Sequence, residues 1–493
     1  MPFGSEETLI GTRCYSTGLV VRDGYFSRLL ALTELIQRNM SLHHLSVIIV
    51  GAGFGGLAAA IELRQRGAKV VVFEASENFR KQGDVISLGA NGTRIIHKWN
   101  SFWEDFLEIS SQFEAAEIYN KAGKLLLTQH TQTEFDGYPA VFTSRGKLHK
   151  MMFDYAKSLG ADIHLGTKIT RYWEDDTGSG VFVEDIKISA NLVLAADGVR
   201  TEARTAVSGQ EQKATKSGVA IYRAWFPMDL LKGHPLTEPI ANATSSGFKV
   251  WIGDGTHCII TTNINLKHVA CFVTHADKGD IAESWNLEGD KEGMLECIQG
   301  WDETLRQVVR SIPEGNLIDY KILWRDPVRQ WVSDSGRIAL LGDAAHPHLA
   351  TAATGGAQAI EDAATISTLL ELLGNGQIPL ALKAYQTLRY QRTSLTQRLG
   401  WETRHRWHFT DWDAVAKNPE LLKLPQPTWL QCHDAEAYVR ENLDTVVSHI
   451  KNGTPFTSTN IPKGHVHQDW TIDDMVRLEK ENVHNGTFYK ATQ

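Results

Sequence analysis

The stretch SVIIVGAGFGG, residues 46–56, decides the fold. It opens on a short run rich in β-branched apolar residues, which predicts a buried parallel strand, and continues into glycines spaced G-x-G-x-x-G. Helical spacing over residues 57–66 predicts a helix that Gly67 ends. Residues 69–73, KVVVF, predict a second buried strand. Strand, helix and strand form one βαβ unit, which implies a right-handed crossover and a parallel sheet.

The glycines and the acid that follows them each have a chemical task in dinucleotide binding. Gly51 permits the tight turn, Gly53 lets the backbone approach a pyrophosphate, and Gly56 allows close packing of helix on strand. The helix N-terminus offers free N–H groups and a positive dipole end to a phosphate. Glu74 ends the second strand, about 20 residues on, where an acid accepts hydrogen bonds from ribose hydroxyls. This pattern predicts a dinucleotide site but does not separate NAD from FAD.

Two later strand ends favour FAD. Residues 192–196 are a short apolar strand that ends in Asp197-Gly198, and residues 337–341 are another that ends in Gly-Asp-Ala-Ala-His-Pro, with Asp343 and Pro347. An aspartate just past a strand end can hydrogen-bond a polyol hydroxyl, and FAD has a ribityl chain where NAD has none. The order of these motifs after the fingerprint therefore points to FAD.

The pattern between these two strand ends is different. From about residue 219 to 274 the chain is rich in β segments, which predicts antiparallel pairing and a second domain. The fold class predicted is α/β: a Rossmann-like FAD-binding domain with an inserted β-rich substrate domain and a C-terminal helical segment. The predicted parts are an N-terminal extension (1–44), the first FAD-binding part (45–218), the substrate domain (219–325), the second FAD-binding part with a long helix (326–400) and a polar C-terminal region (401–493).

Composition excludes several other classes of protein. The 493 residues suffice for about two to four structural units. A formal net charge of -8 without a Lys/Arg cluster argues against nucleic-acid binding, and no apolar run is long enough to span a membrane. Five scattered cysteines make neither a CxxC nor a metal-binding pattern, so we expect no metal site and a cytoplasmic, reducing location. The acids among the first forty-odd residues argue against a transit peptide.

The fingerprint followed by both strand-end motifs resembles the single-component FAD-dependent aromatic hydroxylases. This class includes salicylate and para-hydroxybenzoate hydroxylases, and the similarity is greatest to fungal monooxygenases of secondary metabolism, over about residues 45–400. The resemblance implies that NADH or NADPH reduces FAD, that the reduced flavin binds O2, and that a C4a-hydroperoxide transfers one oxygen atom to the substrate. The implied substrate is an aromatic (phenolic or hydroxybenzoate-like) or polyketide-type small molecule.

The resemblance also implies roles for single residues around the cofactor. Glu74 would bind the adenosine ribose, Arg145 the pyrophosphate, and Asp343 the ribityl and pyrophosphate region. Asp197 matches a residue credited with contacts to both FAD and the nicotinamide cofactor, and Pro347 matches a proline packed near the flavin ring.

Two further segments match loops that lie against the flavin ring. Gly355 and Gly356 open a helix beneath the isoalloxazine, whose dipole and free N–H groups could stabilise the anionic reduced flavin. The family often has Asn where this chain has Ala357, which leaves only a backbone contact there. Residues 83–91 match a loop near the flavin, with Val85 where the family usually has Gly.

The catalytic residues implied are Tyr222 and Arg223, at the start of the β-rich domain. In dearomatising relatives an arginine at this place anchors the phenolate or carboxylate of the substrate; the alternative is that Arg223 is a charge on the sheet surface. Those relatives have a tyrosine where this chain has Thr261, so their substrate class does not transfer directly. His257 matches a turn histidine that we expect to be structural.

Two other functions are compatible with these motifs. One is a dehydrogenase or epoxidase with FAD on the same fold. The other is a Rossmann scaffold that binds a partner or a lipid without redox turnover, although intact Glu74, Asp197 and Asp343 argue against it. A yellow purified protein would separate the flavoenzymes from the scaffold.

Overall fold

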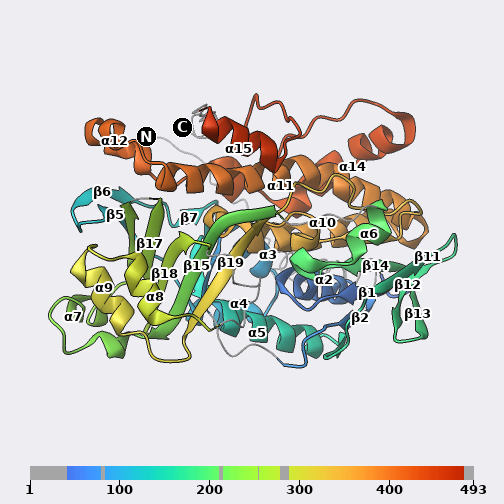
Figure 1. The fold of residues 1–493 in the computed structure, drawn as a ribbon. Helices are drawn as coiled ribbons and strands as arrows, with labels where there is room; N and C mark the ends of the chain where they lie inside the picture. Colours follow the sequence, from blue (N-terminus) through green and yellow to red (C-terminus); the bar gives the residue numbers. More distant parts are fainter. Residues whose placement is uncertain (1–41, 79–83, 210–214, 254, 278–287, 482–493) are drawn as a thin grey trace, which may run out of the picture.

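The computed structural model describes residues 42–78, 84–209, 215–253, 255–277 and 288–481 (Figure 1). The predicted N-terminal extension, 1–44, lies almost wholly outside the described residues. Gly83 of the predicted flavin loop also lies outside the described residues.

The predicted βαβ unit is confirmed, and it lies within a five-stranded parallel sheet. Every strand pair in this sheet is parallel, as the buried β-branched runs predicted. The helix after the glycines, α2 (Phe54–Gln65), packs against α10 (Gly355–Leu373) and α5 (Arg145–Ser158). A meander of β11 (Arg171–Glu174), β12 (Ser179–Val183) and β13 (Ile186–Ala190) packs on β1 (Ser46–Val50) and β14 (Leu192–Ala195). The strand order is β10 (Asp162–His164), β2 (Lys69–Phe73), β1 (Ser46–Val50), β14 (Leu192–Ala195) and β20 (Ile338–Leu340).

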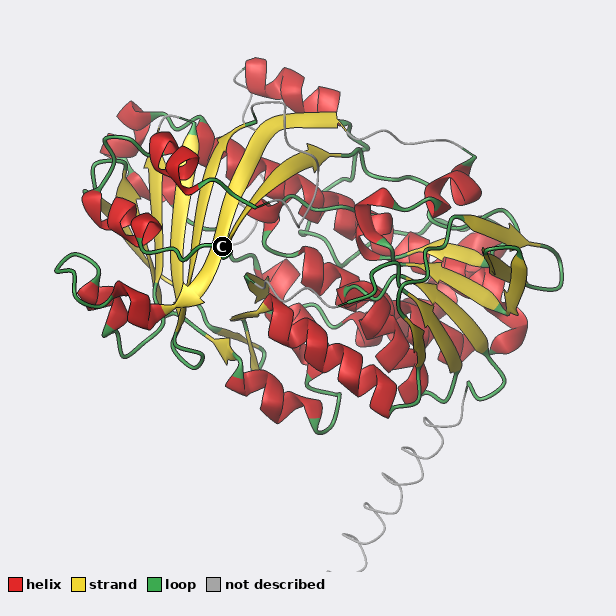
Figure 2. Ribbon diagram, turned by 60° about the horizontal axis from the view of Figure 1, so that its bottom comes forward, coloured by secondary structure: helices red, strands yellow, loops and turns green. Residues whose placement is uncertain are grey.

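The β-rich segments form a second, seven-stranded sheet (Figure 2). The segments predicted between residues 219 and 274 pair antiparallel, as expected. Two more strands enter from residues 115–130, a stretch that reads as polar, and β5 pairs parallel with β16. The order is β19 (Leu317–Trp324), β15 (Thr215–Pro227), β18 (His268–Ala276), β17 (Thr256–Asn263), β16 (Phe248–Gly253), β5 (Ala115–Asn120) and β6 (Leu125–His130).

The two faces of this sheet have different partners. Tyr222 and other residues of one face pack against α8 (Lys291–Cys297) and α9 (Glu303–Arg310). Ile221 is on the opposite face, where it packs with Val85 from the flavin loop. Because side chains alternate along a strand, each residue of β15 belongs to one face only. The face that carries Ile221 is therefore the one that looks toward the predicted flavin segments.

A single long helix connects both sheets. This helix, α11 (Ile378–His408), packs on α10 and also contacts β16 and β17 (Figure 1). The polar C-terminal region adds α14 (Ala435–Asn452), which packs on α10 and α11, and α15 (Ile472–Lys480), whose Ile472 contacts a cluster with Trp324 and Trp401. No helix in the described part of the chain has the length and apolarity that crossing a membrane requires.

The remaining elements are short. They are β3 (Val85–Leu88), α3 (Ala90–Ile96), α4 (Phe102–Glu108), β4 (Ser110–Ser111), β7 (Glu134–Phe135), β8 (Tyr138–Pro139), β9 (Val141–Ser144), α6 (Ala203–Ser208), α7 (Glu238–Ala241), α12 (Trp412–Lys417) and α13 (Thr428–Gln431).

A buried hydrogen bond between α11 and the parallel sheet gives a test of this packing. Tyr385 donates from its hydroxyl to the carbonyl of Leu340, at 3.0 Å. Tyr385→Phe leaves that carbonyl without this donor, so we expect a loss of about 0.5–1.5 kcal/mol and a lower midpoint of thermal unfolding. The matched control is Tyr390→Phe on the same helix, whose hydroxyl bonds Asp469 at the exposed surface. If the control destabilises the protein as much as Tyr385→Phe does, the buried bond does not hold α11 on the sheet.

Candidate active site

The turn between β1 and α2 has the geometry of a pyrophosphate site. Gly51 has φ +99°, and a Cβ on it would lie 2.5 Å from the carbonyl oxygen of Ala196. A Cβ on Gly56 would lie 2.0 Å from the carbonyl oxygen of Gly51, so helix and strand are in contact there. A Cβ on Gly53, in contrast, would meet nothing within 4 Å. The backbone at Gly53 is therefore open to an approaching phosphate, as predicted.

Glu74 lies at the adjacent strand end. Its carboxylate accepts a hydrogen bond from the backbone N–H of Ala52 and another from that of Ser76, both at 2.8 Å. These bonds fix the side chain across the ends of β1 and β2. A carboxylate has about four acceptor positions, so it can still accept bonds from ribose hydroxyls.

Asp197 offers an acceptor that the protein itself does not use. Its Oδ1 is buried and has no hydrogen-bond partner among the described residues. Burial raises the pKa of its carboxyl to about 6, although a hydrogen bond from Thr201 and the charge of Arg204 oppose this shift. Buried polar atoms in native proteins are nearly always paired. A hydroxyl of the dinucleotide would supply the missing donor, so the residues present fit FAD.

Asp343 and Arg145 meet at the same end of the sheet. Asp343 follows β20 in a 3₁₀ turn, Gly342–Ala344, and its side chain is exposed. Desolvation by the surrounding protein raises the pKa of its carboxyl, while the charges of His346 and Arg145 lower it. The guanidinium of Arg145, at the start of α5, lies 5.9 Å from the ring centre of Phe54 on α2. The structure thus brings together segments predicted from three separate parts of the sequence.

Two buried carboxylates on α10 hold the flavin-side loops. Asp362 accepts from the backbone N–H of Gly342 at 3.0 Å and lies 2.6 Å from Nε2 of His346. Its neighbour Glu361 accepts from the side-chain amide of Asn91 at the end of the other predicted flavin loop. The loops that contain Asp343 and Val85 are therefore both hydrogen-bonded to the same turn of α10.

Two arginines on α11 neutralise these carboxylates. Arg389 donates to Asp362 at 2.8 Å and also pairs with Glu361, and Arg392 donates to both oxygens of Glu361 at 2.8 Å. All four side chains are essentially buried. Burial alone would raise the pKa of both carboxyls. Arg392 and Arg389 outweigh it at Glu361, and His346 and Arg389 outweigh it at Asp362, so both pKa values lie below their ordinary range. In the sequence the signal for this cluster is two adjacent acids between apolar residues of the helix, a pattern that does not itself identify their partners.

The remaining predicted flavin contacts lie around the N-terminus of α10. A Cβ on Gly356 would lie 2.9 Å from Cδ1 of Ile86, so β3 passes directly over this glycine. A Cβ on Gly355 would lie 3.2 Å from Cβ of His348. The carbonyl of Pro347 accepts a hydrogen bond from Gln397 of α11 at 2.8 Å. Val85 on β3 packs against Ile221 and Phe272 of the seven-stranded sheet, which brings this sheet against the predicted flavin loop.

Arg223 points from the seven-stranded sheet toward these loops. Its Nε lies 2.5 Å from Oδ2 of Asp84, and the two side chains are only 12% and 8% exposed. Its guanidinium also lies 5.2 Å from the ring centre of Phe272. Burial lowers the pKa of Arg223, and Arg145 adds to this effect while Asp84 opposes it. Arg223 is therefore a buried cation near the flavin loops and not a solvated charge on the sheet surface.

Asp84 is a site residue for which no role was predicted. It lies at the start of the predicted flavin loop, and its backbone carbonyl accepts from the N–H of Arg145 at 2.7 Å. Within the described residues its Oδ1 is buried and has no hydrogen-bond partner. In the sequence, Asp84 is an acidic residue within residues 83–91, the segment that resembles a flavin loop of the family.

The structure does not bring Tyr222 together with Arg223. Tyr222 lies on the opposite face of the sheet, where its ring stacks on His275 with centroids 4.3 Å apart. Burial, followed by the charge of Asp319, raises the pKa of its phenol. Thr261, in contrast, is buried on the face that carries Arg223, because Thr261 pairs with Ala270 and Ala270 pairs with Trp225.

A family model described as FAD binding domain matches residues 44–398. The chain belongs to this family. Curated relatives include asperlicin C monooxygenase of Petromyces alliaceus, 35% identical over 434 residues, which cover 84% of this chain and 93% of the relative. Another is the FAD-dependent monooxygenase fsr3 of Gibberella fujikuroi, 31% identical over 452 residues, or 87% of this chain and 86% of the relative. The protein is thus an FAD-dependent monooxygenase, an oxidoreductase, and not a non-redox scaffold.

Solved structures of similar proteins have the same fold. CtdE in complex with FAD and substrate 4 aligns with a TM-score of 0.78 and 31% identity over 83% of this chain and all of that one. FqzB aligns with a TM-score of 0.78 and 32% identity over 86% of this chain and all of that one. A salicylate hydroxylase substrate complex, with a TM-score of 0.66 and 21% identity over 80% of this chain and 97% of that one, shares the fold. The predicted fold class and the predicted cofactor FAD are confirmed for this monooxygenase.

Asp343 gives a direct test of the cofactor contacts. We expect Asp343→Ala to bind FAD about ten- to a hundredfold more weakly, since a hydrogen bond to a charged group contributes roughly 1.5–3 kcal/mol. The measurement is flavin per protein after dilution and gel filtration. Asp473→Ala, an exposed aspartate on α15, is the control. Equal flavin content in both variants would contradict the role of Asp343.

The cluster on α10 gives a test by pH. Because the folded pKa of Glu361 is depressed, its contribution to stability is present above the ordinary pKa of 4.5 and is lost as the pH falls toward the folded pKa. Glu361→Gln should cost about 3–5 kcal/mol at pH 7, since it leaves buried arginines without their full counter-charge. The variant should also lose less stability than wild type below pH 4.5. Glu441→Gln, on the exposed surface of α14, should change neither quantity; equal acid sensitivity in Glu361→Gln and wild type would refute the assignment.

Proposed function

We propose that this monooxygenase uses NADH or NADPH and O2 to hydroxylate an aromatic, phenolic or hydroxybenzoate-like, or polyketide-type small molecule. The observation that carries the proposal is the buried pair of Arg223 and Asp84, on the sheet face that looks toward the flavin loops. Bound FAD, once reduced by the nicotinamide cofactor, would supply the activated oxygen. The protein supplies the binding site, the orientation and the electrostatics.

Arg223 is suited to binding an ionised ring substituent. A cation within about 4–6 Å favours the charged form of an acid, so Arg223 would lower the pKa of a bound phenol. A phenolate carries more electron density on its ring than a phenol does, which favours attack on an electrophilic oxygen. The planar guanidinium can also hold a carboxylate or phenolate in a defined orientation.

Asp84 supplies the counter-charge that the buried guanidinium of Arg223 requires. A cation in this position without a counter-charge would be strongly destabilising, because desolvation is costly. Asp84 balances the charge, and its backbone bond to Arg145 ties it to the pyrophosphate end of the site. We infer that Asp84 positions Arg223 and that the guanidinium of Arg223 binds the anionic group of the substrate.

The first test is turnover by the purified, flavin-loaded protein. We expect NAD(P)H consumption to rise with some members of a panel of phenols and hydroxybenzoates, with asperlicin C added because one relative is named for it. Oxygen consumption and the amount of hydroxylated product should rise in proportion to NAD(P)H consumption. Oxidation of a panel member without oxygen uptake would indicate a dehydrogenase and would contradict the proposal.

Arg223 gives the second test. Arg223→Ala should keep its FAD, because no predicted flavin contact is removed. It should lose at least about tenfold in kcat/KM, since losing a desolvated charge partner typically costs about 2–5 kcal/mol. Hydrogen peroxide released per NAD(P)H should rise as the ring becomes less well oriented. Arg223→Lys should recover only part of the activity, since it lacks the planar fork. Wild-type efficiency and coupling in Arg223→Ala would place the substrate anchor elsewhere.

A further inference from the structure

A row of aromatic rings runs from a flavin-side loop to the surface of the protein. His346 lies in the loop that follows β20, beside Pro347, which is predicted to pack near the flavin ring. Its ring centre is 5.2 Å from that of Trp331, and Trp331 is 6.2 Å from the ring centre of Tyr390 on α11. His346 and Trp331 are buried, whereas Tyr390 is half-buried. The row therefore begins at the cofactor loop and ends where water has access.

Trp331 is held in place beside the strand that leads to Asp343. Its backbone carbonyl accepts a hydrogen bond from the N–H of Leu340 on β20, at 2.8 Å. Its indole Nε1 donates to the carbonyl of Val328 at 2.6 Å. The indole is one of the side chains that lose an electron most readily. Trp331 is therefore a fixed electron donor between the flavin-side loop and α11.

Tyr390 has a partner that can take its proton. Its hydroxyl donates to Oδ1 of Asp469 at 2.7 Å, and the side chain of Asp469 is 42% exposed. The hydrogen bond from Tyr390 lowers the pKa of Asp469, and the charge of Arg329 adds to this effect while burial opposes it. A phenol that loses an electron becomes a very strong acid and must lose its proton as well. The carboxylate of Asp469 can accept that proton and pass it to water.

The second tyrosine beside the indole lacks such a partner. Tyr385 lies 5.4 Å from Trp331 and is completely buried. Its hydroxyl donates to the carbonyl of Leu340 at 3.0 Å, and a backbone carbonyl is too weak a base to take a proton. Burial also raises the pKa of this phenol well above its ordinary value. Of the two tyrosines, Tyr390 is therefore the one that can be oxidised.

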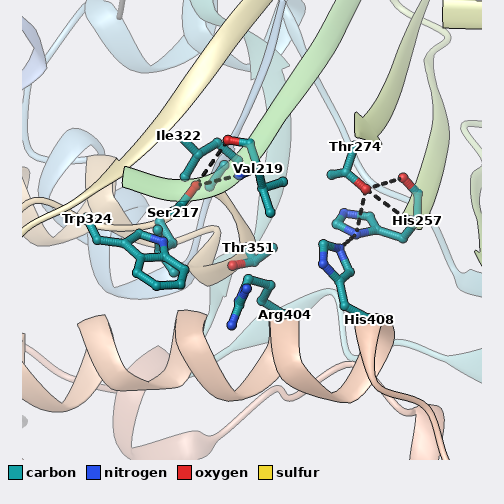
Figure 3. Close-up of a pocket in the computed structure, with 11 residues that line it drawn as sticks. Ser217, Val219, His257, Thr274, Ile322, Trp324, Thr351, Arg404 and His408 are labelled. Atoms are coloured by element: carbon teal, nitrogen blue, oxygen red, sulfur yellow. Dashed lines mark hydrogen bonds between the residues drawn. The ribbon is translucent and has the colours of Figure 1, made fainter. Parts of the chain in front are cut away.

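A pair of tryptophans farther along α11 has the opposite environment. The ring centres of Trp324 and Trp401 are 4.0 Å apart. The guanidinium of Arg404 lies 4.8 Å from the ring centre of Trp324 and 4.6 Å from that of Trp401 (Figure 3). Oxidation would place a positive charge on an indole next to this cation, which raises the free energy of the oxidised form. Trp324 is therefore a poor electron donor and a matched control for Trp331.

We propose that Trp331 and Tyr390 form a path for single electrons from the surface to the flavin-side loop, and that this path removes one-electron oxidants that arise at the flavin. Such oxidants include an oxygen radical formed when reduced flavin meets O2 without a substrate. The path is a second function of the fold, separate from hydroxylation. It requires bound FAD but neither a substrate nor a nicotinamide cofactor, so its test is independent of the proposed function.

The electrons and protons of the path balance. Trp331 gives one electron to the oxidant and becomes an indole radical cation. Tyr390 returns one electron to Trp331 and releases its phenolic proton to Asp469, which leaves a neutral tyrosyl radical near the surface. A thiol in solution then restores Tyr390 by donating one hydrogen atom, and Asp469 releases its proton to water. The net result is a reduced oxidant inside the protein and a thiyl radical outside it.

Blue light gives a direct test, because photoexcited oxidised flavin is itself a one-electron oxidant. The flavin-loaded protein is illuminated without O2, frozen, and examined by electron paramagnetic resonance. Protein grown with ring-deuterated tyrosine identifies a tyrosyl radical by the narrowing of its spectrum. The variants are Tyr390→Phe, Trp331→Phe and Asp469→Asn, whose amide oxygen can still accept the hydrogen bond but cannot take the proton. The controls are Tyr385→Phe and Trp324→Phe, and flavin content is measured for every protein.

We expect a tyrosyl radical in wild type and in both controls. Tyr390→Phe and Asp469→Asn should lose most of this signal and leave a tryptophanyl radical, whereas Trp331→Phe should lose both signals. Absence of a tyrosyl radical in wild type, or a wild-type signal in Tyr390→Phe, would overturn the proposal. An equal loss in Tyr385→Phe would also overturn it. A wild-type signal in Asp469→Asn would contradict the assignment of Asp469 as the proton acceptor.

The protective role has its own measurement. The flavin-loaded proteins are reduced chemically and reoxidised by O2 in repeated cycles, and mass spectrometry then measures oxidation within residues 338–354, the segment that contains His346. We expect this segment to be oxidised more in Tyr390→Phe than in wild type or Tyr385→Phe. Equal oxidation in all three proteins would show that the path does not protect the site.

Discussion

The buried carboxylate pair on α10 is the interaction on which the rest of the site depends. Glu361 and Asp362 hold the two flavin-side loops, and the arginines of α11 make that burial possible. A buried ion network of this kind contributes little net stability compared with an apolar core, but removing one member is costly. Its value here is geometric: it fixes segments distant in sequence within one site. Specificity of structure, not stability, is the best explanation for so many charges in a buried position.

The same long helix connects the parallel sheet to the seven-stranded sheet. Arg389 and Arg392 lie near the middle of α11, and His408, which ends it, lies 2.8 Å from His257 of β17. Arg223 completes the connection from the other direction, because it reaches from the seven-stranded sheet to Asp84 in a flavin loop. The seven-stranded sheet therefore meets the rest of the molecule through the charged contact of Arg223 with Asp84 and through the packing of α11 on β16 and β17.

The cofactor half of the site was predictable because its signals are local. The fingerprint from Gly51 to Gly56 and the aspartates at two strand ends depend on backbone geometry and on short spacing, and the structure places them together. The substrate half depends on long-range register. Tyr222 and Arg223 are neighbours in sequence but face opposite sides of β15, which a motif match does not reveal.

The C-terminal region shows the same limit. Residues 401–493 carry no recognisable motif, yet His408 pairs with His257 at 2.8 Å and Ile472 of α15 packs in a cluster with Trp324 of β19. Such contacts join residues about 150 positions apart, and a single sequence holds no local sign of them. The strands β5 and β6 are hard to predict because β6 forms the largely exposed edge of the sheet and β5 buries only Ala116 and Ile118, which leaves little alternation of apolar and polar residues.

The most direct measurement of the central claim is the origin of the oxygen atom in the product. A substrate found to stimulate NAD(P)H consumption should be turned over under dioxygen enriched in the heavy isotope, and the product analysed by mass spectrometry. The account predicts that one labelled oxygen atom enters each product molecule, and that labelled water contributes none. A product that carries oxygen only from water, or that is oxidised without gaining oxygen, would contradict it.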